Sequence, residues 1–209
     1  MTFIAAEPRP FQPGTTGWTA RDLDDPEIER QWFSGRYEIV EGVLTTMAAA
    51  YFPGGNATAN VIVAVKEHLK HRGLPGRFAV ELDIVVDETR ISRADAAMLL
   101  PADVVRQEQA ARNAGRSNSR RTRILVPPTL IIESVSPGHE LHDERTKRRW
   151  YAEFGVPNYW IVDAYELSFL CLVLRDGSYL DDAVGHGDEA IRPSLFPGLV
   201  LSLKEIWES

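Results

Sequence analysis

Two short apolar runs on either side of one helical segment constrain this chain more than any other feature. TLIIESV at residues 129–135 and NYWIVD at 158–163 have the length of strands and the apolar character of strands covered on both faces. Between them, Trp150, Tyr151 and Phe154 recur at helical spacing and mark one face. The pattern predicts two central strands of a sheet with a helix packed beside them.

One lysine of this helix lies on its apolar face. Lys147 precedes the three aromatic residues by three, four and seven positions, so it shares their face. Its basic neighbours Arg145, Arg148 and Arg149 point elsewhere. Since burying an unpaired charge is costly, Lys147 is expected to meet a carboxylate or to serve the chemistry of a site.

The other patterns mix strands and helices along the chain. They predict a short helix at 26–34, a hairpin turning at Glu41-Gly42, a helix capped by Asn56 and ending at Gly73, strands at 78–86 and 95–100, a hairpin turning at Asp176-Gly177, and a closing strand and helix after 195. This order favours the α/β class, with a mixed β-sheet flanked by helices and with N- and C-terminal hairpins.

Length and composition favour one domain in this chain of 209 residues, of which 44% are hydrophobic. We expect an irregular N-terminal arm at 1–25 and a single domain at 26–209, with an irregular basic insertion at 101–127. No apolar run approaches the roughly 20 residues of a membrane helix, and the first residues do not resemble a secretory signal. The single cysteine, Cys171, lies in an apolar run and is expected to be a buried thiol. The expected location is the cytoplasm, with no membrane partner.

Two acids interrupt apolar strands and need a partner. Glu133 lies within LIIESV and Asp95 begins DAAMLL, and neither can remain charged without a cation nearby. Two carboxylates on neighbouring strands with an inward Lys147 would suit Mg²⁺, or Mn²⁺ in its place, together with a substrate phosphate. A plain ion pair between Lys147 and Glu133 explains the same pattern equally well. Asp163, which ends NYWIVD, is expected to cap a turn.

The charge of the chain is unevenly distributed. Residues 106–123 contain six arginines and one acid, for a net charge of +5, which leaves −12 for the remainder of a chain whose net charge is −7. This asymmetry favours local contact with phosphate, and a solvated loop is an equally good explanation. The predicted nucleic-acid contacts are Arg116, Arg120, Arg121 and Arg123.

Three pieces of the sequence together resemble a known family. RYEIVEGVL, SRADAAMLL and PPTLIIESVSPGHELHDERTKRRWYAEFGVPNYWIVD occur in an order that resembles the Uma2 family, endonucleases of the PD-(D/E)XK restriction-endonuclease-like superfamily. The resemblance covers most of residues 30–207. It implies a mixed sheet flanked by helices, a Mg²⁺ site and hydrolysis of phosphodiester bonds in nucleic acid, with DNA as the expected partner.

The resemblance also implies roles for individual residues. Asp95 matches the aspartate of the family's Pro-Asp element, Glu133 the acid on the following strand, and Lys147 a lysine placed on the next helix. Glu38 matches a frequent N-terminal glutamate, and Glu41 follows it on the opposite face of the strand. The implied catalytic set is therefore Asp95, Glu133, Lys147 and Glu38, with Asp95 and Glu133 as the metal ligands.

Three positions depart from the family's pattern. Ala94 stands where a proline is usual, Val135 where the superfamily has its strand lysine, and Asn56 near a frequent histidine. All lysine chemistry therefore depends on Lys147. The alternative to an endonuclease is a non-catalytic nucleic-acid-binding or regulatory module that retains the fold, and a homodimer is expected by analogy alone.

Overall fold

The structure is a computed structural model that describes residues 9–47, 52–114, 123–135 and 142–208, without the side chains of 142–144. Its main sheet has eight strands in the order β2-β1-β4-β5-β6-β7-β8, with β3 paired to β4 outside this path. The strands are β1 Tyr37–Val40, β2 Val43–Thr46, β3 Arg77–Val85, β4 Ile91–Leu99, β5 Leu130–Ser134, β6 Asn158–Asp163, β7 Ser168–Arg175 and β8 Ser178–His186. A small second sheet pairs β9 Ala190–Ile191 with β10 Leu201–Ser202. The predicted fold class is confirmed.

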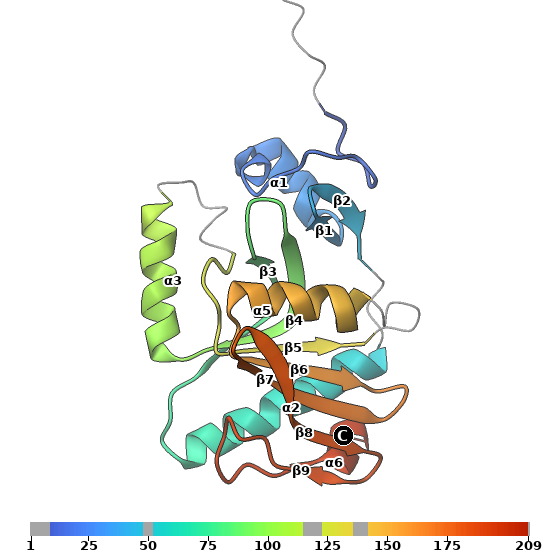
Figure 1. Ribbon diagram of the computed structural model, residues 1–209, viewed down its shortest axis with the longest axis vertical. Coiled ribbons are helices and arrows are strands. Elements are labelled where there is room, and N and C mark those ends of the chain that lie inside the picture. The colour runs from blue at the N-terminus through green and yellow to red at the C-terminus, as the bar shows by residue number, and fades with distance from the viewer. Residues whose placement is uncertain (1–8, 48–51, 115–122, 136–141, 209) are drawn as a thin grey trace, which may run out of the picture.

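Helices cover both faces of the sheet (Figure 1). The helical elements are η1 Asp22–Asp24, α1 Pro26–Phe33, α2 Phe52–His71, α3 Pro101–Asn113, a wide π-type segment η2 His142–Lys147, α5 Arg148–Phe154 and α6 Leu203–Glu208. One core cluster packs α2 and α6 against one face, and a second packs the aromatic side of α5 against the other. Among the described residues, no helix is both long enough and apolar enough to span a membrane.

The central strand–helix–strand unit forms as the sequence predicts. β5 and β6 pair in parallel, whereas every other described pair of strands in the main sheet is antiparallel. Both strands are almost wholly buried, because each is covered on both faces and has a neighbour on either side. Gly155 ends α5 with φ of 89°, the left-handed conformation that an L side chain adopts only with strain. This cap lets the chain turn at once into β6.

Two sequence predictions about helices were wrong. The segment 101–127 was expected to be irregular, yet Pro101–Asn113 forms α3. Proline presets the first helical turn, and the Asp103 carboxylate accepts hydrogen bonds from the Leu100 N–H at 3.0 Å and from the Thr129 hydroxyl. The second error concerns Asn56, because α2 already includes Phe52 and Asn56 therefore lies inside the helix.

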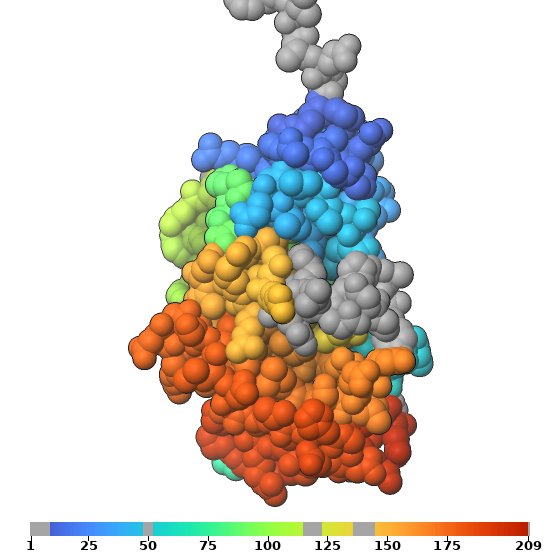
Figure 2. Space-filling view, turned by 45° about the vertical axis from the view of Figure 1, so that its right-hand side comes forward, coloured from blue at the N-terminus to red at the C-terminus, as the bar shows by residue number. Residues whose placement is uncertain are grey.

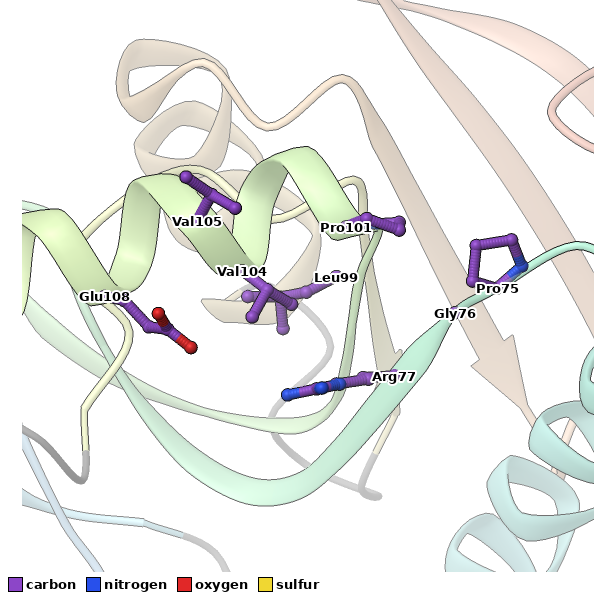
Figure 3. A pocket seen from close by; sticks show the side chains of 8 residues that line it. All are labelled: Pro75, Gly76, Arg77, Leu99, Pro101, Val104, Val105 and Glu108. Carbon is purple, nitrogen blue, oxygen red and sulfur yellow. The ribbon is translucent and has the colours of Figure 1, made fainter.

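A pocket of about 350 Å³ lies between the start of α3 and the start of β3 (Figure 3). Leu99, Val104 and Val105 give it an apolar wall, and Arg77 and Glu108 also line it. The charged residues among those that line this pocket are one acid and one arginine, so they differ from the acids and the lysine of the candidate active site.

The cap of α5 generates a stability prediction. Gly155→Ala should destabilise the fold by about 1–2 kcal/mol, because φ of 89° is costly for a residue with a Cβ. The added Cβ would come no closer than 3.8 Å to a neighbour, so the cost is conformational. Gly55→Ala in α2 is the matched control. Its Cβ meets nothing within 4 Å, and we expect stabilisation by about 0.4–1 kcal/mol. Urea unfolding of both variants measures the difference, and equal effects would contradict the account.

Candidate active site

Lys147 faces inward, as its place on the aromatic stripe predicts. It lies where the wide turn η2 gives way to α5, and only 3% of it is exposed. Its Nζ is 3.2 Å from Glu133 Oε1 and 3.3 Å from Glu38 Oε1. One buried ammonium is thus shared by two carboxylates.

The two carboxylates come from strands that are far apart in the sequence. Glu38 belongs to β1 and Glu133 to β5, and they are 3% and 2% exposed. Glu38 Oε1 also accepts a hydrogen bond from the backbone N–H of Arg93 at 3.1 Å, which ties β1 to β4. The structure therefore brings together three of the four predicted site residues, Glu38, Glu133 and Lys147.

A tyrosine and a serine complete this cluster. Tyr151, one helical turn after Lys147, donates its hydroxyl proton to Glu133 Oε1 at 2.7 Å. Because that single proton is used, the Ser92 hydroxyl, 2.9 Å away, is left to donate to the Tyr151 oxygen. Both residues are fully buried. Sequence reasoning assigned Tyr151 to the core, although a buried tyrosine hydroxyl usually needs a polar partner.

Tyr151 is held as a proton donor. Burial, and after it the nearby Glu133 carboxylate, raises the pKa of Tyr151 well above its usual value. The hydroxyl therefore stays protonated at any pH near neutrality and continues to donate to Glu133.

Asp95, the fourth predicted residue, lies beside this cluster. Its Oδ2 accepts hydrogen bonds from the Ser134 backbone N–H at 2.6 Å and from the Ser134 hydroxyl at 2.7 Å. Glu81 of β3 and Asp95 of β4 would face each other, but the register of the two strands leaves both unpaired at this point. The φ of Glu81 is 50° there. Asp95 is half-buried, so it is the most accessible of the three acids.

The donor chemistry of this region fits a hard divalent cation. Asp95 and Glu133 offer carboxylate oxygens from adjacent strands, and Mg²⁺ and Mn²⁺ bind preferentially to oxygen. Three carboxylates, with Glu38, stand against one ammonium in the described part of the site. In the parts of the chain that the structure describes, no three Asp, Glu, His or Cys side chains form a ready metal cluster. A bound Mg²⁺ would therefore complete its shell with water or phosphate, as it commonly does.

The predicted nucleic-acid contacts divide into two groups. Arg116, Arg120 and Arg121 lie outside the described residues. Arg123 is 2% exposed, and its guanidinium lies 3.4 Å from Asp83 and 3.8 Å from Glu29. It is therefore engaged inside the protein.

Asp83 is the centre of a second buried network. Its carboxylate also accepts hydrogen bonds from Arg93 Nε at 2.8 Å and from the Trp32 indole N–H at 2.7 Å. This network anchors α1 to β3 and β4, and through the backbone of Arg93 it adjoins Glu38.

Two other predictions about single residues are confirmed. Asp163 caps the turn after β6, where one carboxylate oxygen accepts the N–H groups of Tyr165 and Glu166, each at 2.9 Å. Cys171 is buried, and burial followed by the Asp182 carboxylate raises the pKa of its thiol.

Comparison with known proteins agrees with this geometry. The sequence profile of the Uma2 family, described as "Putative restriction endonuclease", matches residues 28–204. The chain belongs to the Uma2 family. Among solved structures, a "putative nuclease belonging to DUF820" from Anabaena variabilis ATCC 29413 aligns with a TM-score of 0.63 over 83% of this chain and 90% of that one. The identity is 17%, so this likeness bears on the fold alone. Comparison with curated proteins finds no match.

Family and fold together support a nuclease role for this Uma2 protein. The match of 28–204 contains Glu38, Asp95, Glu133 and Lys147, so the whole cluster lies within the family's domain.

The hydroxyl of Tyr151 generates a testable stability difference. Tyr151→Phe should destabilise the protein by about 1.5–3 kcal/mol, because it removes a hydrogen bond to a buried carboxylate. Tyr179→Phe is the matched control. That buried tyrosine donates to the neutral carbonyl of Val156 at 2.8 Å, and its loss should cost about 0.5–1.5 kcal/mol. Denaturant unfolding of both variants tests the ranking, which the reverse order would overturn.

Proposed function

We propose that this Uma2 protein is a Mg²⁺-dependent endonuclease that hydrolyses phosphodiester bonds in nucleic acid. The observation that carries the proposal is the shared placement of Lys147 between Glu38 and Glu133, with Asp95 on the next strand. A simple ion pair needs one acid for one base. The carboxylates of Asp95 and Glu133 offer oxygen ligands to a divalent cation, which would in turn attract a substrate phosphate.

Each residue has a distinct part in the proposed reaction. Asp95 and Glu133 would hold Mg²⁺, which supplies an activated water and offsets negative charge on the phosphate. Lys147 would turn Nζ from a carboxylate to the attacking water or to a phosphate oxygen. Glu38 keeps the ammonium in place before the substrate arrives.

Tyr151 supports the movement of Lys147. If Lys147 turns away from Glu133, the Tyr151 hydroxyl still donates to the same oxygen. Glu133 is then not left as an unpaired buried charge, which would be strongly destabilising.

A nucleic-acid-binding or regulatory module that retains the fold is the second candidate. The burial of Glu38, Glu133 and Lys147, each with 3% exposure or less, favours it, because a substrate reaches them only after neighbouring groups move. We further propose DNA as the polymer from the nature of the family, a homodimer as the working form by analogy with enzymes of this fold, and the cytoplasm as the location from the composition of the chain.

Asp95→Asn tests metal dependence with little risk to the fold. The side-chain oxygen of asparagine can still accept from Ser134, whereas the negative charge is lost. We expect calorimetric titration to show Mn²⁺ binding by the wild type and little by the variant. Mg²⁺-dependent cleavage of a plasmid should fall by at least about 100-fold, since even indirect partners of a metal often change activity by 10–100-fold.

Asp163→Asn is the matched control for that experiment. The carboxylate of Asp163, at the end of β6, also accepts two hydrogen bonds, but it caps a turn. Its variant should bind Mn²⁺ and cleave as the wild type does. If the wild type neither binds Mn²⁺ nor cleaves nucleic acid, the catalytic proposal fails and the binding module remains.

A further inference from the structure

The outer face of α5 and the turn before it carry a second stripe of side chains. Arg145, Arg148, Arg149, Ala152 and Glu153 follow helical spacing, offset from the inward stripe that contains Lys147. The stripe is basic, with three arginines and one acid. The proposed chemistry leaves these arginines unexplained.

The outer stripe forms one wall of a groove. The opposite wall is formed by Gly177, in the turn between β7 and β8, and by Ser178 and Tyr179 at the start of β8, and the groove has a volume of about 530 Å³. Figure 2 shows α5, in amber, at the surface beside the orange strands that follow it. Arg148 bridges the two walls by donating to the Tyr179 carbonyl at 3.1 Å, which holds its guanidinium in the groove.

The other two arginines can reach a ligand at little cost. Arg145 is exposed, and within the described part of the chain it makes no hydrogen bond or ion pair. Arg149 lies 3.3 Å from Glu41 and 3.8 Å from Glu153, and all three side chains are about half exposed, at 59%, 56% and 48%. Ion pairs between exposed side chains of this kind contribute little, so a phosphate can replace the carboxylates.

We propose that this groove binds the phosphates of a nucleic-acid backbone. The inference rests on the proposed function and adds a place where the substrate would be held, on the helix that carries Lys147. Guanidinium groups pair with phosphate through parallel hydrogen bonds. Among the described residues that line it, the groove offers no aromatic face for a base, because the Tyr179 ring is buried and its hydroxyl bonds to Val156. Contact is therefore expected with the backbone and without preference for sequence.

A basic groove would offset the net negative charge of the chain when it binds a polyanion. With a net charge of −7, the protein repels nucleic acid at long range. Arginines grouped on one helix face provide a local attraction for phosphate within this acidic chain.

Salt-dependent binding tests the groove. The protein carries Asp95→Asn so that no substrate is cut, and binding of labelled duplex and single-stranded oligonucleotides is measured between about 50 and 200 mM salt. Log affinity falls as log salt rises, and the double variant Arg145→Gln with Arg149→Gln should make this slope shallower by about 1.4–1.8. Each lost phosphate contact removes about 0.7–0.9 from its magnitude. The loss should be the same for unrelated sequences. Arg145→Gln alone, which breaks no described contact, should lower the slope by about half as much.

A charge-matched control separates the groove from general electrostatics. Arg72→Gln with Arg192→Gln removes the same charge from exposed arginines beyond the end of α2 and beyond β9, and should leave the slope unchanged. If the groove variant and the control give equal slopes, the groove proposal fails and the nuclease proposal stands. If the protein with Asp95→Asn alone binds no oligonucleotide, the proposed function itself fails. If the groove variant changes only the oligomeric state in light scattering, the arginines bind an acidic surface of a second copy, which overturns the inference.

Discussion

The ammonium of Lys147, shared between Glu38 and Glu133 inside the protein, is the interaction on which the site depends. It joins β1, β5 and the start of α5, three elements that are separate in the sequence. Removing one partner from such a buried set leaves an uncompensated charge, with a typical cost of about 3–5 kcal/mol. The same set joins the start of α5 to β1 and β5, so the fold and the proposed chemistry depend on the same residues.

Around this centre the structure arranges two hydrogen-bonded supports. Tyr151 of α5, bonded to Ser92 of β4, positions Glu133, and the Arg93 backbone of β4 positions Glu38. Asp95 lies apart from Lys147 and is bound to Ser134 at the partly exposed end of β5. We infer that the metal would enter from the Asp95 side, because that acid is half-buried whereas Glu133 is enclosed.

Sequence patterns predicted the elements of the site better than its contacts. The stripe of aromatic residues in α5 located Lys147, and the apolar context of Glu133 indicated a buried charge, because both signals are local. The contacts of Tyr151 with Ser92 and of Arg123 with Asp83 join residues 59 and 40 positions apart, and no local pattern reports them. Helix α3 was not predicted because its sequence is mostly polar and shows no clear apolar face. The signal for its start was Pro101 followed by Asp103.

The most direct test of the account is anomalous diffraction from crystals soaked in Mn²⁺. We predict a peak between the carboxylates of Asp95 and Glu133, with Tyr151 still bonded to Glu133 and with Lys147 retained beside Glu38. Soaked crystals of Asp95→Asn should lack the peak. If wild-type crystals show no peak, while Asp95 stays on Ser134 and Lys147 stays between its two glutamates, the cluster is an ion-pair network and the catalytic account is contradicted.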